Sequence, residues 1–201
     1  LARRHPGKSR AEVEKILGQT LAIDRFHWLS HGELAGDDTD AHIDTLARFA
    51  ARDRIVYQGC ESQLDEHYAA LHRMAGELSA LTTRNREPYE LFPLPFAPPI
   101  FAADGRRLAA SYANFLIVNG GVLMPGYDVD TDLDAAEVLQ AAFPDHDVVI
   151  VPCRPFIEQN YLLGQSNNFA DDASLLEHQV MDSTGVLELV SFLEGRFGVQ
   201  V

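Results

Sequence analysis

Residues 111–124 read SYANFLIVNGGVLM, and this stretch contains the pattern that decides the fold. Its apolar first half is typical of a strand, the Asn119-Gly120-Gly121 turn requires positive φ, and the apolar residues that follow indicate a returning strand. Apolar residues at helical spacing then predict a helix that Asp130 or Thr131 caps and Pro144 ends. A buried strand is predicted over residues 148–151, so the order is hairpin, helix, strand.

The same order of elements is predicted upstream. A strand over residues 43–49 and its partner over residues 55–57 form the hairpin, and residues 51–53 connect them. Apolar residues at spacings of three and four predict a helix over residues 64–81, and residues 89–94 form the closing strand. Two copies of one arrangement indicate an α/β repeat architecture, with its site near the axis that relates the copies.

Three further features are predicted before and between these two copies. Ser9 and Glu12 have the spacing of a capping box, which predicts a short amphipathic helix that ends at Gly18. Residues 25–29 form a predicted strand that contains Trp28, the single tryptophan, which we expect in the core. The prolines of residues 93–99 predict an extended connection between the copies.

Titratable side chains are concentrated in residues 36–45, GDDTDAHIDT, just before the first predicted hairpin. If the backbone is extended from Asp40 onward, alternation places Asp40, His42 and Asp44 on one face of the strand. Two carboxylates that flank an imidazole can hold a cation and move a proton, because the acids set the tautomer and raise the basicity of the ring. The alternative is an edge strand whose polar face lies in water.

Length and charge limit the classes of function. The chain has 201 residues, which suits one domain or two small ones, and 46% hydrophobic with 23% charged residues is ordinary for a globular protein. A formal charge of -14 argues against nucleic acid and membrane as partners and favours small cationic ligands. Two cysteines, no apolar run of spanning length and no signal peptide lead us to expect a soluble, cytoplasmic protein. The chain begins with Leu1 and not Met, which leads us to expect either a piece of something longer or a processed chain.

Several runs resemble the C-terminal half of the agmatine deiminases, members of the peptidylarginine-deiminase (pentein) superfamily. They are GDDTDAHIDTLARF, DEHYAAL, RLAASYANFLIVNGGVLMP and LQAAFPDHDVV, and the resemblance extends over about residues 10–158. It implies a five-bladed α/β propeller of ββαβ modules, of which this chain would supply about two. On this interpretation residues 1–158 are a partial pentein domain.

The resemblance also implies a reaction: agmatine and water give N-carbamoylputrescine and ammonia, a step of putrescine and polyamine biosynthesis that needs no cofactor and no metal. A cysteine thiolate attacks the guanidinium carbon, and water later releases the ureido product. His42 would be the acid and base, and Asp44 would bind the guanidinium nitrogens. Asp38 stands where the family usually has glutamate and would orient His42, and Asp40 would lie beside the substrate.

One departure from the family concerns the nucleophile. Family members continue from a segment like residues 153–159 into a short turn and a His-Cys pair, whereas this chain continues with residues 160–163, NYLL, and contains no His-Cys pair. Cys60 and Cys153 match positions that are not nucleophilic, where each acts as a small apolar filler. We therefore expect no turnover from this chain, and an inactive amidine-binding module is one alternative.

Residues 159–201 resemble a different family, the acyl carrier proteins. The runs NFADDASLLE (168–177) and MDSTGVLELV (181–190) are similar to the segment around the carrier attachment site, and Ser183 would carry phosphopantetheine. Residues 161–201 contain six acids and one base, which suits docking on acyl-transfer or adenylating enzymes. The alternative is a helix in solvent that Ser183 merely caps.

Overall fold

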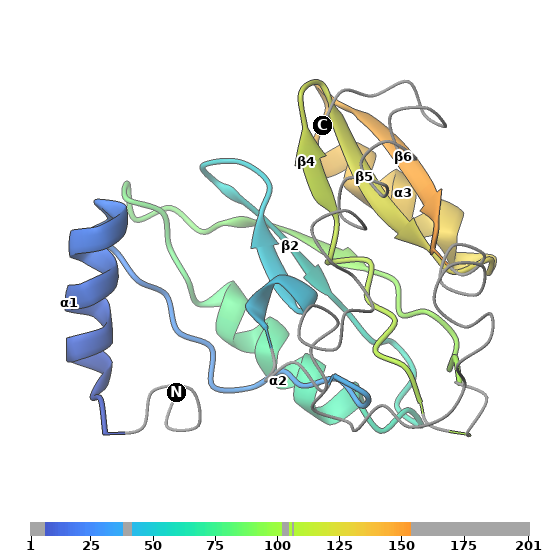
Figure 1. Ribbon diagram of the computed structural model, residues 1–201, viewed down its shortest axis with the longest axis horizontal. Helices are drawn as coiled ribbons and strands as arrows, with labels where there is room; N and C mark the ends of the chain where they lie inside the picture. The colour runs from blue at the N-terminus through green and yellow to red at the C-terminus, as the bar shows by residue number, and fades with distance from the viewer. Residues whose placement is uncertain (1–6, 38–41, 102–104, 106, 154–201) are drawn as a thin grey trace, which may run out of the picture.

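The computed structural model describes residues 7–37, 42–101, 105 and 107–153 (Figure 1). Figure 1 shows helix α1 at one end of the molecule, a first sheet with helix α2 in the middle, and a second sheet with helix α3 at the other end. The elements in chain order are α1 (Arg10–Leu21), the 3-10 helix η1 (Ile43–Thr45), β1 (Ala47–Phe49), β2 (Arg54–Gln58), α2 (Tyr68–Ser79), β3 (Glu90–Leu94), β4 (Leu116–Val118), β5 (Gly121–Gly126), α3 (Thr131–Ala142) and β6 (Asp147–Pro152).

Two modules with the same connectivity follow α1 in the described part of the chain. In the first, β1 pairs antiparallel with β2, the chain crosses over through α2, and β3 returns parallel to β2. In the second, β4, β5, α3 and β6 repeat these steps. The predicted α/β class and the repeated order of hairpin, helix and strand are therefore confirmed, and Gly120 has the positive φ of 79° that the hairpin turn requires.

The first sheet is covered on both faces, because side chains alternate along β2. Ile55 packs in a cluster with Leu71 and Met74 of α2. Its neighbour Val56 points the other way, into a cluster with Leu139 of α3. Helix α3 contacts β2 and β3 of the first sheet as well as β6 of its own. The two modules thus share one apolar layer, and α3 lies between them.

The strand predicted over residues 43–49 is wrong in its first half. Residues Ile43–Thr45 form a 3-10 turn, and only Ala47–Phe49 is a strand. Within the turn, the hydroxyl of Thr45 donates to the carbonyl of His42 at 2.7 Å, and the backbone N–H of Thr45 donates to the same oxygen at 3.1 Å. Such local side-chain bonds compete with the ladder of a sheet, so the alternation assumed for His42 and Asp44 does not exist here.

The N-terminal region confirms one prediction and corrects two others. Ser9 and Glu12 form the capping box, but α1 continues past Gly18 and ends at Leu21, with Ala22 as its C-cap at a φ of 53°. Residues 25–29 make no sheet. Trp28 is half-buried and not in the core. Its ring packs against α1 instead, where the ring N–H donates to Glu14 at 2.6 Å and the guanidinium of Arg10 lies 4.5 Å from the ring centroid.

Other element boundaries also differ from the predicted ones. Helix α2 begins at Tyr68 and not near residue 64, and β4 begins at Leu116 and not at Ser111. The buried residues before β4 bond to a side chain instead of a strand, because the Tyr112 N–H donates to Gln58 Oε1 at 3.1 Å. None of the helices in the described part of the chain has the length and apolar character that crossing a bilayer requires.

Candidate functional site

His42 and Asp44 lie at the start of the 3-10 turn. The imidazole Nδ1 of His42 is 3.7 Å from a carboxylate oxygen of Asp44, and each side chain is 46% exposed. The structure therefore brings the two predicted residues together, although a tight turn does so and not one face of a strand. Half-exposed groups at this distance can both contact a small ligand that approaches from solvent.

The remaining predicted site residues lie outside the described part of the chain. This applies to Asp38 and Asp40, and equally to Ser183 and the whole predicted carrier segment, residues 159–201. The expected domain boundary at residue 158 also lies there.

A buried polar network supports the turn that carries His42 and Asp44. The hydroxyl of Ser111 donates to the carbonyl of Thr45 at 2.5 Å and lies 3.1 Å from Oε1 of Gln58. Gln58 is fully buried, and its amide nitrogen donates to the carbonyl of Pro95 at 2.7 Å. Since Gln58 ends β2 and Ser111 leads toward β4, the turn that carries His42 rests on both modules.

Arg48 is a neighbour of Asp44 that the sequence reasoning did not single out. Its guanidinium donates to the carbonyl of Phe115 and lies 4.4 Å from the centroid of the Phe115 ring. Burial lowers the pKa of Arg48, and the negative charge of Asp44 opposes that shift. Arg48 belongs to the run LARF just after the turn, which is the signal that could have identified it.

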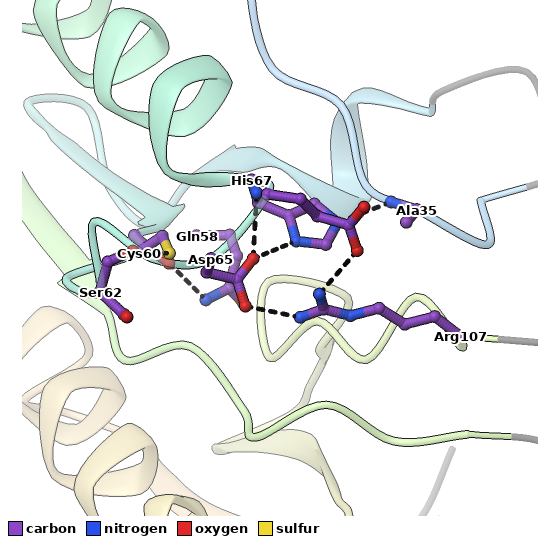
Figure 2. Close-up of polar contacts among 9 residues, drawn as sticks. Ala35, Gln58, Cys60, Ser62, Asp65, His67 and Arg107 are labelled. Atoms are coloured by element: carbon purple, nitrogen blue, oxygen red, sulfur yellow. Dashed lines mark hydrogen bonds and ion pairs between the residues drawn. The ribbon is translucent and has the colours of Figure 1, made fainter.

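A second cluster of titratable groups lies at the start of α2, and we call Asp65, Glu66, His67 and Arg107 the anchor cluster. Figure 2 shows Asp65 between the imidazole of His67 and the guanidinium of Arg107. Desolvation alone would raise the pKa of Asp65, but hydrogen bonds from Arg107 and from the backbone and ring of His67 outweigh it and hold the pKa at about 2. Asp65 is therefore ionised throughout the neutral range.

Neither cysteine is in a setting that activates a thiol. Burial raises the pKa of Cys60, and the charge of Asp65 adds to that effect. Burial also raises the pKa of Cys153, at the end of β6. Since the thiolate is the nucleophilic form, both thiols are poor nucleophiles at neutral pH. This agrees with the interpretation of both residues as apolar fillers.

Comparison with known sequences gives one family for most of the chain. Residues 1–161 match the family of Porphyromonas-type peptidyl-arginine deiminases. The agmatine deiminase of Pseudomonas fluorescens strain SBW25 is 32% identical over 171 residues, covering 77% of this chain and 46% of that protein. The agmatine deiminase of Stutzerimonas stutzeri has the same identity and coverage. The chain thus spans about half the length of these curated relatives.

Solved structures agree with this result. A crystal structure of a candidate arginine deiminase from Porphyromonas gingivalis superposes with a TM-score of 0.73 at 46% identity, covering 79% of this chain and 46% of that one. A serine variant of the C. jejuni agmatine deiminase, with substrate bound, gives a TM-score of 0.67 at 35% identity, covering 76% and 44%. The mixed α/β fold of the described residues matches these deiminase structures.

Proposed function

Because the chain belongs to the Porphyromonas-type peptidyl-arginine deiminase family, we propose that His42 and Asp44 form part of a site for a small guanidinium compound such as agmatine. The proposed reaction type is that of the agmatine deiminases, in which agmatine and water give N-carbamoylputrescine and ammonia on the way to putrescine. The single observation that carries the proposal is the 3.7 Å approach of the His42 imidazole to the Asp44 carboxylate, with both groups accessible to a ligand.

Each residue has a role that its chemistry suits. The Asp44 carboxylate has two oxygens that can accept two parallel N–H groups of a planar guanidinium, and such charged, bidentate pairs are strong. The His42 imidazole can give a proton to the nitrogen that leaves as ammonia and take one from the water that enters. Asp38 and Asp40 would add negative charge beside the cation. The chain's overall charge of -14 would also favour such a ligand by steering.

The covalent step requires a thiolate at the guanidinium carbon. The carbon–sulfur bond forms, the carbon–nitrogen bond to ammonia breaks, and water then displaces the sulfur to release the ureido product. Cys60 and Cys153 do not suit this step, because burial keeps both thiols protonated. We therefore propose that this chain, as it stands, binds the amidine without turning it over. A pentein-type propeller remains the proposed architecture.

Calorimetry with agmatine tests the binding. Asp44→Asn removes the charge that faces the guanidinium and should weaken binding by about tenfold or more, the factor that one charged hydrogen bond is worth. Asp53→Asn is the matched control, because Asp53 is an exposed acid in the turn between β1 and β2, and its binding should equal that of the wild type. A wild-type chain that gives no binding heat would contradict the proposal.

An assay for ammonia tests the absence of turnover. We expect none to be released from agmatine by the wild-type chain. If ammonia is released, and His42→Ala abolishes the release, then the chain does contain a nucleophile and the proposal of binding without turnover is wrong.

Phosphopantetheine on Ser183 is a separate hypothesis that rests on the sequence of residues 159–201 alone. The match to the deiminase family ends at residue 161, and none of the comparisons supports a carrier segment. Incubation with a phosphopantetheinyl transferase and coenzyme A should raise the intact mass by one arm, and Ser183→Ala should prevent the increase. An unchanged mass of the wild-type chain would end this hypothesis, and with it docking on acyl-transfer or adenylating enzymes.

A further inference from the structure

We propose that His67 is a positioning residue for the turn that carries His42 and Asp44, and that Asp65 and Arg107 hold it in the state this requires. The inference rests on the proposed function, because it concerns the geometry of that site. It is drawn from contacts that join the start of α2 to the loop before the turn.

The hydrogen bonds of His67 define its protonation. The side chain is 4% exposed, its Nδ1 is 2.6 Å from Asp65 Oδ1, and its Nε2 is 2.8 Å from the backbone nitrogen of Ala35. A backbone N–H can only donate, so Nε2 must be the acceptor and cannot carry a proton. The proton therefore sits on Nδ1 and points at Asp65, which makes the ring neutral and defines its tautomer.

Arg107 holds Asp65 in its charged form, in which Oδ1 accepts the hydrogen bond from the Nδ1–H of His67. One guanidinium nitrogen lies 2.8 Å from Asp65 Oδ2 and the other lies 2.7 Å from Glu66 Oε1 (Figure 2). The Phe96 ring closes another side, with its centroid 5.0 Å from that of the His67 ring. The ring therefore faces one carboxylate, one aromatic ring and one backbone donor. Since the pKa of Asp65 is held at about 2, the carboxylate stays charged and the tautomer stays defined across the neutral range.

The loop that His67 anchors also lies against the segment at Arg107. At Gly36, where φ is +80°, a Cβ would collide with the carbonyl oxygen of Arg107, so the loop backbone lies against that segment. The N–H of Asp37 donates to the carbonyl of Leu34 at 3.2 Å and closes the loop.

Thr45 joins this loop to the site. Its hydroxyl lies 3.5 Å from Asp37 Oδ2 and donates to the carbonyl of His42 at 2.7 Å. The loop that His67 holds at Ala35 thus comes within 3.5 Å of Thr45, whose hydroxyl bonds to the carbonyl of His42. We therefore expect a shift of the loop at Ala35 to change the position of the turn.

Two substitutions separate the two contacts of the ring. The amide of glutamine reaches the place of Nε2, so His67→Gln keeps an acceptor for the Ala35 N–H. The amide of asparagine reaches the place of Nδ1, so His67→Asn keeps a donor for Asp65 but leaves Ala35 without its acceptor. His72→Asn is the control, because His72 is an exposed histidine on the same helix.

Amide hydrogen exchange followed by NMR on the full chain tests the anchor without any ligand. His67→Asn should speed exchange at both Ala35 and Thr45, whereas His67→Gln and His72→Asn should leave Thr45 close to wild type. Faster exchange at Ala35 alone would show that the contact is local and would overturn the proposal. Imidazole nitrogen shifts that place the proton of His67 on Nε2 would also overturn it.

Agmatine titrations then test the consequence for the site. His67→Asn should weaken binding several-fold, because the turn that carries Asp44 loses the support of the loop, and His67→Gln should restore most of it. Equal binding by wild type and His67→Asn would overturn the positioning role. If no variant and no wild-type chain binds agmatine, the proposed function is wrong, while the exchange experiment still decides whether the anchor exists.

Discussion

The two modules have the same order of strands and helix, but the aspartate near the start of each helix makes different contacts. In the second module, Asp132 accepts hydrogen bonds from the backbone N–H groups of Tyr127 and Asp128, at 3.0 Å and 2.9 Å, and from the hydroxyl of Tyr112 at 2.7 Å. In the first module, Asp65 binds His67 two residues away and Arg107, which lies 42 residues away in sequence.

The difference shows how one topology serves two purposes. Asp132 satisfies the backbone N–H groups of Tyr127 and Asp128, which precede α3, and so stabilises its own module. Asp65 binds Arg107 directly and the loop at Ala35 through the His67 ring, and so joins the start of α2 to both. A contact with the adjoining connection holds that connection in place, whereas a long-range anchor determines where separate loops lie relative to one another. We therefore expect the first module to determine the geometry of the site and the second to contribute mainly stability.

The largest expected effect concerns the layer that the modules share. Leu139 of α3 is fully buried between the two sheets, and Leu139→Ala should lower the free energy of unfolding by roughly 3 kcal/mol, because it leaves a cavity. Leu133→Ala on the same helix is the control, since Leu133 is 68% exposed and should change stability by less than about 0.5 kcal/mol. Urea unfolding measures both, and similar losses would mean that α3 does not join the modules as described.

Asp132→Asn should have the next largest effect. It keeps the size of the side chain but removes the charged acceptor of several N–H groups and of the Tyr112 hydroxyl, at a cost of about 2 to 3 kcal/mol. Asp134→Asn is the matched control, an exposed acid in the same helical turn. Urea unfolding of both variants at neutral pH provides the comparison. A loss that is equal in the two variants would contradict the role of Asp132 as the acceptor of these hydrogen bonds.

Asp65→Asn should cost less and depend on pH. The pKa of Asp65 is lowered from 3.8 to about 2 in the folded chain, so its charge contributes stability above the unfolded pKa. A shift of this size corresponds to about 2 kcal/mol at pH 7, and the contribution is lost as the pH falls from about 4 to 2. Urea unfolding across this range should show wild type and variant converging in acid.

The control for this pH dependence is Glu61→Gln, which changes an exposed acid near the anchor cluster. Its difference from wild type should be small and nearly independent of pH. If Asp65→Asn behaves in the same way, Asp65 is not held by Arg107 and His67 as described.

The smallest effect is expected outside both modules. Ser9→Ala removes one half of the capping box of α1, in which the Ser9 hydroxyl accepts from the Glu12 N–H at 3.3 Å, and should cost about 1 kcal/mol. Amide exchange that becomes faster in α1 and stays unchanged in α2 and α3 would confirm that α1 is independent of the modules. Ser30→Ala, at an exposed serine, serves as the control.

The sequence by itself determined the features that depend on neighbouring residues. Ser9 and Glu12 predicted the start of α1, Gly120 predicted a hairpin turn, and apolar spacing predicted α2, α3 and the two-module order. The runs that resemble the deiminases pointed to a family that the comparison confirmed. These features are local, so a short stretch of chain carries all the information that they need.

Only the tertiary structure decided which distant groups meet. Residues Ile43–Thr45 have the pattern of a strand, yet the hydroxyls of Thr45 and Ser111 support a turn there. His67 lies in the run DEHYAAL, where its titratable ring and its place near the start of a helix were visible, but its contacts with Ala35 and, through Asp65, with Arg107 were not. Hydrogen bonds between residues far apart in sequence leave no periodic pattern, because their geometry exists only once the sheets and helices have packed.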